Sequence, residues 1–136
     1  MTADLKQILA SAIRSNSQCD VTGGLVFNRN YFAQVLEGEF AAVTQTYARI
    51  SNDPRHTDVC IVDMKPVSKR LFGAWSMGYA GNTKLFEALC KEYGHAGGFD
   101  PPGMSANDLL AFILTLVTNE EMVASSREVA GHLAQA

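Results

Sequence analysis

Two short stretches near the start of the chain have the hydrophobic pattern of β-strands. They cover residues 21–27 and 31–36, and Asn28-Arg29-Asn30 between them predicts a hairpin turn. Gly23 and Gly24 are neighbours in the first strand, where the lack of side chains indicates a bulge or a close approach by another group. We therefore expect a β-hairpin early in the fold.

The second of these strands carries a polar side chain at an apolar position. Alternation of side chains sends Phe32, Gln34 and Leu36 to the same face of the sheet. If that face is buried, the Gln34 amide must find hydrogen-bond partners, because an unsatisfied buried amide costs about 1–3 kcal/mol. Either the protein itself supplies those partners, or a polar, planar ligand does.

Further along the chain, apolar residues recur with the 3.6-residue period of amphipathic helices. The first helix is expected from residue 3 to about Asn16. Others are expected from residue 40 to a stop at 52–54, over 83–90, over 109–117 behind a cap at Ser105, and over 120–133. Two more strands are predicted for residues 59–64 and 71–79.

The order of these elements predicts an α+β fold. Helix, two strands, helix and two strands make a ferredoxin-like βαββαββ arrangement minus its first strand, with a mixed sheet, two covering helices and C-terminal helices. We expect residues 1–82 to form the core and residues 83–136 a helical extension. The apolar faces of the later helices must pack on the open side of the sheet or on a second copy of the protein, and we therefore expect a homo-oligomer.

The composition narrows the range of functions. A net charge of −3 and a pI near 5.5 provide no basic surface for nucleic acid or an anionic membrane, and the longest apolar run, 109–117, is too short to span a bilayer. We therefore expect a cytoplasmic protein that binds neither nucleic acid nor membrane. The widely spaced Cys19, Cys60 and Cys90 are expected to be reduced and mostly buried. Because no nucleophile–base or metal-binding signature occurs, we expect that the protein is not an enzyme.

Several polar residues have two interpretations when spacing alone is considered. Asn16 is either an ordinary helix-terminal residue or a ligand contact. Arg49 and Asp53 are either an i, i+4 surface ion pair or part of a site for a ligand with polar edges and phosphates. Trp75 and Met77 lie on one face of their strand, and core filling is the simpler explanation for them.

A set of motifs spread in order over residues 4–80 resembles the BLUF domain, the family of blue-light sensors that use FAD. The motifs are Arg14-Ser15-Asn16, Val21-Thr22-Gly23-Gly24-Leu25, Phe32-Ala33-Gln34-Val35-Leu36-Glu37-Gly38, Tyr47-Ala48-Arg49-Ile50, Asp53-Pro54-Arg55-His56 and Arg70-Leu71-Phe72-Gly73-Ala74-Trp75-Ser76-Met77. Residues 85–117 also resemble the two-helix extension of the short, stand-alone members. The set is highly specific, although VTG or LEG alone would be weak.

The resemblance implies a flavin-binding photoreceptor domain that signals through a hydrogen-bond rearrangement near Gln34. In that family the isoalloxazine ring of FAD lies between the two covering helices. The resemblance implies that Asn16 and Gln34 bind the polar edge of the flavin, Arg49 and Asp53 its ring carbonyl and imide side, Arg55 and His56 the ribityl and phosphate part, and Ile8 and Ile50 the two ring faces. Trp75 and Met77 would then report the light state to a downstream signalling protein, whose identity the sequence does not give.

The chain departs from the family pattern at the first strand. Family members carry there a Tyr that hydrogen-bonds the Gln and takes part in light-driven electron and proton transfer. Tyr31, Tyr47, Tyr79 and Tyr93 of this chain lie in other elements, so the family's usual photocycle is not expected to run in this chain. Ser15 also replaces an Asn or His that is common at its position, which weakens one flavin contact.

The missing strand leaves three ways to complete the sheet. The strand is encoded upstream, or another segment or a second molecule fills the gap, or the remaining strands close up and degrade the flavin pocket. The alternative function is accordingly a degenerate, flavin-free module for interaction or oligomerisation, without photochemistry.

Overall fold

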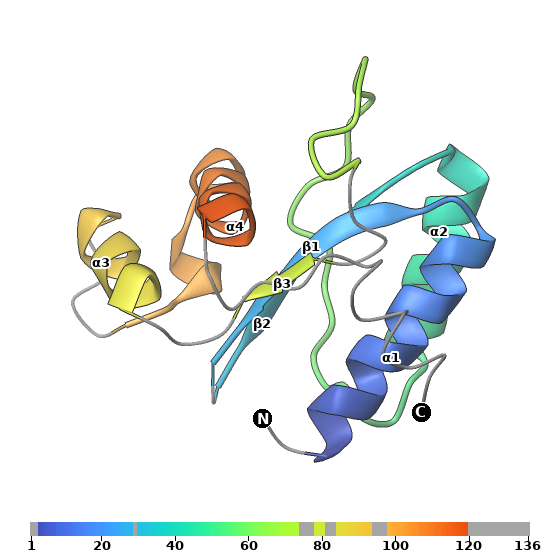
Figure 1. Cartoon of the computed structure of the whole chain (residues 1–136), viewed down its shortest axis with the longest axis horizontal. Helices are drawn as coiled ribbons and strands as arrows, with labels where there is room; N and C mark the ends of the chain where they lie inside the picture. Colours follow the sequence, from blue (N-terminus) through green and yellow to red (C-terminus); the bar gives the residue numbers. More distant parts are fainter. Residues whose placement is uncertain (1–2, 29, 74–77, 81–83, 94–97, 120–136) are drawn as a thin grey trace.

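The computed structural model describes residues 3–28, 30–73, 78–80, 84–93 and 98–119. In chain order these form α1 (Ala3–Gln18), β1 (Thr22–Phe27), β2 (Phe32–Glu37), α2 (Phe40–Ser51), β3 (Gly78–Ala80), α3 (Lys84–Glu92), a 3₁₀ turn (Pro101–Gly103) and α4 (Ala106–Asn119). The strands form a sheet of order β2-β1-β3, which Figure 1 shows crossing the middle of the molecule.

The hairpin predicted from the sequence is confirmed. β1 and β2 pair antiparallel from Thr22 opposite Glu37 to Phe27 opposite Phe32, and β3 pairs parallel to β1, so the sheet is mixed as expected. The Asn28 side-chain oxygen closes the turn by accepting the backbone N–H groups of Asn30 and Tyr31, at 2.9 and 2.8 Å.

Helices cover both faces of this sheet. α1 and α2 lie on one face, and α4, with α3 beyond it, lies on the other (Figure 1). The α4 face is a dry core of thirteen buried residues among those described, drawn from β1, β2 and the segments 72–117. The expected cap is present, since the Ser105 hydroxyl accepts the Asp108 N–H at 3.1 Å. α4 therefore buries its apolar side on its own sheet, so the apolar run of this helix does not require a second copy.

The face under α1 and α2 is packed differently. Its core cluster has three buried members, Leu9, Ile13 and Leu25, with Phe27 and Phe32 packed against them. No residue of α2, which the structure describes in full, belongs to that cluster. Of the stripe expected on α2, Phe40 is 75% exposed, and only Thr46 on this helix is buried. α2 thus stands off the sheet instead of packing tightly against it.

Gly24 confirms the expected close approach. A Cβ atom at Gly24 would lie 2.7 Å from Cε1 of Phe72, whose ring is fully buried against β1, and 3.2 Å from Cγ2 of Ile113 on α4. Because a methyl group would overlap the ring edge, glycine lets Phe72 fit between the sheet and α4.

The strand predicted for residues 59–64 is not formed, and that prediction was wrong. Residues 57–70 have no regular secondary structure, and Ile61, Val62, Met64 and Val67 are all more than half exposed. The β-type pattern is present, but no strand in the described part of the chain lies beside this segment to pair with it. Cys60 is exposed for the same reason, whereas Cys19 is half-buried and Cys90 buried; all three are free thiols.

The strand predicted for residues 71–79 is confirmed at its end, where β3 covers Gly78–Ala80, whereas residues 71–73 have no regular secondary structure. The predictions for Trp75 and Met77, and for a helix over 120–133, concern residues outside those described.

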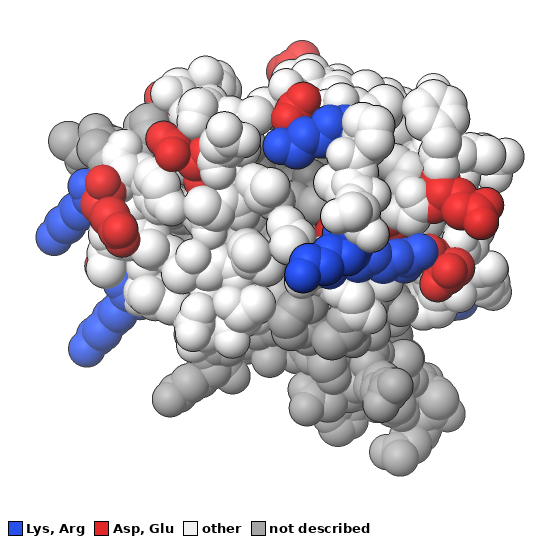
Figure 2. Space-filling model, turned by 90° about the horizontal axis from the view of Figure 1, so that it is seen from above, with Lys and Arg blue, Asp and Glu red and all other residues white. Residues whose placement is uncertain are grey.

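Charged side chains are scattered over the surface. On the face in Figure 2, Lys and Arg alternate with Asp and Glu in small groups, without a broad basic area among the residues shown in colour. Within the described ranges, no helix has the length and apolar character needed to cross a membrane.

Candidate functional site

A cavity of about 540 Å³ lies between α1, the hairpin and α2, in the space that α2 leaves open. Its walls contain all eight residues for which the resemblance implies flavin contacts: Ile8, Asn16, Gln34, Arg49, Ile50, Asp53, Arg55 and His56. These come from four separate parts of the chain. The fold brings them around one volume, which lies within the roughly 300–1,000 Å³ range of small-molecule sites.

The α1 wall follows from the helical period. Ile8, Ser11, Ala12, Ser15 and Asn16 recur at spacings of three and four and so share one side of the helix. Asn16 is 1% exposed and lies in the last turn of α1, where its backbone carbonyl accepts the Val21 N–H at 2.9 Å. Asn16 is therefore both a helix-terminal residue and a cavity residue.

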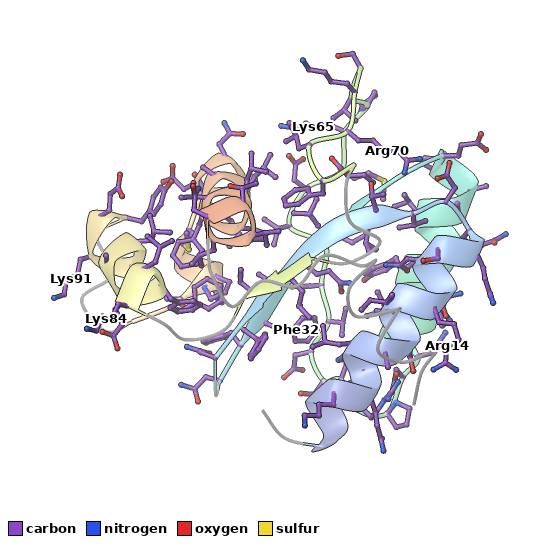
Figure 3. All side chains as sticks on the ribbon, in the orientation of Figure 1. Arg14, Phe32, Lys65, Arg70, Lys84 and Lys91 are labelled. Atoms are coloured by element: carbon purple, nitrogen blue, oxygen red, sulfur yellow. The ribbon has the colours of Figure 1, made fainter. Side chains whose placement is uncertain are left out.

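The sheet wall contains Gln34 on β2 and its register partner Leu25 on β1. Phe32, labelled in Figure 3, lies between the hairpin and α1 and shares the Gln34 face, as alternation predicted. Gln34 is half-buried, and both Gln34 and Asn16 already have an interaction partner inside the protein. In the described residues every buried side-chain nitrogen or oxygen has a hydrogen-bond partner. The Gln34 amide thus does not require a ligand, although open space lies beside it.

The α2 wall combines hydroxyl, cationic and apolar groups. Thr46, Arg49 and Ile50 face the cavity at helical spacing, and Asp53 follows one turn later. Arg49 donates from Nη2 to the Thr46 hydroxyl at 3.5 Å, and Thr46 in turn donates to the carbonyl of Ala42 at 2.8 Å. The sequence analysis did not select Thr46, although its spacing from Arg49 and Ile50 could have indicated it.

Asp53 pairs with Arg55, and not with Arg49 as the i, i+4 spacing suggested. Arg55 donates from Nε and Nη2 to the two carboxylate oxygens, at 3.0 and 2.6 Å, and its backbone N–H adds a bond of 2.9 Å. These bonds hold the pKa of the Asp53 carboxyl well below its usual range. The two side chains therefore act as one clamped unit at the edge of the cavity.

His56 lies at the same edge. Its ring is 4.9 Å from the ring of Phe32, centroid to centroid. Burial lowers the pKa of His56 from its ordinary 6.5, against the opposing effect of the Asp53 charge. A neutral imidazole is therefore the preferred form at neutral pH.

The site can hold a flat molecule with one polar edge and an anionic tail. Apolar Ile8 and Ile50 come from α1 and α2, and the amide-bearing residues Asn16 and Gln34 line the same cavity. Counting His56 as neutral, the described lining residues carry one net positive charge, because Arg49 and Arg55 outnumber Asp53. An isoalloxazine ring with a ribityl phosphate chain has this combination of shape, polarity and charge.

Three further cavity residues, Asn28, Asn30 and Tyr31, come from the hairpin turn. From the sequence, Asn28 and Asn30 were assigned to the turn, and Tyr31 to the start of the second strand. The sequence offered one indication of a cavity position for these residues, namely that they lie next to the strand that carries Gln34. The sequence did not show to which side of the sheet the turn would point.

Comparison with known proteins identifies the family of the chain. The family model BLUF, described as sensors of blue-light using FAD, matches residues 1–78. Photoactivated adenylate cyclase subunit beta of Euglena gracilis is 43% identical over 83 residues, which are 60% of this chain and 10% of the cyclase subunit. The chain thus spans about a tenth of the length of that relative.

Solved structures agree over most of the chain. The photo-activated state of BlsA superimposes with a TM-score of 0.79 and 28% identity, covering 86% of this chain and 83% of BlsA. The dark state of BlrB, a BLUF protein, superimposes with a TM-score of 0.69 and 29% identity, covering 83% of each chain. The α+β arrangement, including the α3–α4 extension, is therefore shared with these proteins.

Proposed function

Because this chain belongs to the BLUF family, and is by that membership a blue-light sensory domain, we propose that its cavity binds FAD with the isoalloxazine ring between α1 and α2. The observation that carries the proposal is the convergence of eight implied flavin-contact residues on one open volume. FAD, when bound, supplies the absorption of blue light. The chain itself acts as a sensor and not as an enzyme, and a cytoplasmic location remains our expectation.

Asn16 and Gln34 bind the polar edge of the ring in this proposal. Each amide can both donate and accept, so each can exchange an internal partner for a ligand atom without leaving a buried polar group unpaired. Ile8 and Ile50 hold the two ring faces from α1 and α2. Filling the cavity would also bury the half-exposed inner side of α2, which the protein core leaves uncovered.

Arg49, Arg55 and His56 contact the remaining parts of the ligand in this proposal. Arg55 is clamped by Asp53, so this unit offers a fixed set of donors and acceptors to the polar side of the ligand. Arg49 has no carboxylate pair among the described residues, so its guanidinium group is available to the ring carbonyl, while Arg55 lies nearer the ribityl and phosphate part in this proposal. His56 packs on Phe32 and closes the rim.

Signalling starts from the position of Gln34. Its amide lies on β2 at the cavity wall, so rotation or tautomerisation of that amide would change hydrogen bonds to the ligand and to the protein together. Of the tyrosines, Tyr31 lines the cavity, 41% exposed. We keep the expectation that the family's usual photocycle does not run without the first-strand Tyr.

An absorption spectrum of the purified chain, with and without added FAD, tests the proposal. A yellow protein, or uptake of FAD with quenching of flavin fluorescence, supports it, and a colourless chain that takes up no FAD overturns it. Gln34→Leu should weaken FAD binding about 5–30-fold, the equivalent of 1–2 kcal/mol. Gln45→Leu is the matched control, because Gln45 lies exposed on α2 away from the cavity lining and should leave affinity unchanged. A small reversible red shift under blue light would separately refute the expectation about the photocycle.

A second candidate function is a flavin-free interaction module, favoured by the exposed apolar residues of the segment 61–71. These side chains are available to a partner, and we propose a second copy of this chain as that partner, with the downstream signalling protein undefined. Oligomerisation that is identical with and without FAD and light, in a colourless protein, would favour this function over photoreception.

A further inference from the structure

Glu37 is a buried acidic residue at the end of β2, 8% exposed and outside the cavity. Its Oε2 accepts the Leu71 N–H at 2.7 Å, and its Oε1 accepts the Phe72 N–H at 2.8 Å and the Thr22 hydroxyl at 3.1 Å. Burying a carboxylate is costly unless such bonds compensate it. Here one side chain satisfies two successive backbone N–H groups in a segment that has no strand partner.

A second set of contacts holds Thr22, whose hydroxyl group donates to Glu37. Arg70, labelled in Figure 3, donates from Nη1 to the Thr22 hydroxyl and from Nη2 to Asp20, both at 3.3 Å. Thr22 is also the register partner of Glu37 across the hairpin. The side chains of Glu37 and Arg70 thereby connect the end of the hairpin to residues 70–72.

Phe72 extends this connection to α4. Its ring is fully buried and belongs to the core cluster that includes Phe112, Ile113 and Leu116 of α4. The ring lies against Gly24 at the point that Ile113 also approaches. Since this core is close-packed, a displacement of Phe72 must be accommodated by α4.

β2 therefore touches two different environments within a few residues. Gln34 faces the cavity, and Glu37, an odd number of positions away, faces the α4 side of the sheet. We propose that the Glu37 carboxylate is the positioning residue that transmits the state of the cavity from β2, through Phe72, to α4. This inference rests on the proposed binding of FAD, and it assigns α4 as the element whose packing reports the occupied site.

Hydrogen–deuterium exchange of the full chain, with and without FAD, tests the link. In the wild-type chain, FAD should slow amide exchange in β1 and β2 and also in residues 109–117. Glu37→Gln presents an amide NH₂ to backbone N–H donors, so it should still take up FAD and slow exchange in β1 and β2, while the effect at 109–117 is lost. Glu39→Gln is the matched control, because Glu39 is exposed just before α2, and it should behave as wild type.

The outcomes separate the two claims. If wild-type protein takes up no FAD, the proposed function fails, and the link fails with it. If FAD binds but exchange at 109–117 slows equally in Glu37→Gln and wild type, only the link is overturned. Thr22→Val provides a milder test should Glu37→Gln not fold, since it removes one donor to Glu37 and keeps both backbone bonds. It should reduce the response at 109–117, and an undiminished response would again contradict the link.

Discussion

Gly24→Ala should destabilise the protein by overpacking the contact between β1 and Phe72. The new methyl carbon would lie 2.7 and 3.0 Å from two carbons of the Phe72 ring and 3.2 Å from Cγ2 of Ile113. Neither side chain has room to retreat, since Phe72 and Ile113 are 0% and 1% exposed. Overpacking of a core typically costs about 1–3 kcal/mol. Alanine also reduces the conformational freedom of the unfolded chain, which stabilises the folded state by about 0.4–1 kcal/mol. The net loss is therefore about 0–2.6 kcal/mol, with a midpoint of about 1.3 kcal/mol.

Urea unfolding followed by far-UV circular dichroism measures this loss by linear extrapolation. Gly73→Ala is the matched control, because among the described residues a Cβ there meets only Cβ of Arg70, at an ordinary 3.6 Å. It should be neutral or slightly stabilising. Phe72→Leu removes the ring edge, so in that background Gly24→Ala should cost at least about 1 kcal/mol less, as expected for residues in direct contact. Equal stability of Gly24→Ala and Gly73→Ala, or strictly additive effects with Phe72→Leu, would refute the proposed packing.

Three further predictions concern other parts of the molecule. Burial lowers the pKa of His56 in the folded chain below its ordinary 6.5, so between the folded and unfolded pKa values the unfolded chain binds more protons, and the free energy of unfolding should fall as the pH drops through that window. His56→Gln should make the free energy of unfolding depend less on pH between about pH 8 and about pH 5. An unchanged slope would contradict the assignment to His56. Ser105→Ala should cost about 1 kcal/mol of unfolding free energy through loss of the α4 cap, whereas Ser105→Asp, which keeps an acceptor, should not. Replacing exposed Val62 and Met64 with lysine should dissociate the proposed homo-oligomer in sizing chromatography, and a wild-type chain that elutes as a monomer would argue against it.

Elements stabilised by local contacts were predictable from the sequence. The hairpin depends on its Asn28 turn, and α4 depends on a serine cap next to a strong apolar run, so both followed from short-range chemistry. The strand predicted for residues 59–64 did not follow from local contacts in this way. A segment such as 59–64 becomes a strand only when a neighbouring strand pairs with it, and local sequence carries no information on that neighbour.

The candidate site depended on a different kind of information. Spacing alone left Asn16, Arg49 and Asp53 ambiguous, and only the family resemblance linked them into one binding site. The structure adds what neither could supply: Asp53 is held by Arg55, and Asn16 and Gln34 each already have an interaction partner within the protein. Glu37 was present in a quoted motif, but its role depends on contacts with residues 71 and 72 that are 34 and 35 positions away.

The unequal packing of the two faces of the sheet has a consequence for signalling. The α4 face is a contiguous dry core, whereas the α2 face leaves a cavity and a helix with one buried side chain. Local free energies of opening follow the amount of buried apolar contact, so motion should be easiest near α2 and hardest near α4. A ligand that fills the cavity therefore acts on the α2 face, where opening is easiest. β2 transmits the change to the close-packed α4 face, where even a small displacement of Phe72 must move α4. A sensor needs both properties, and in this chain they lie on opposite sides of the same strand.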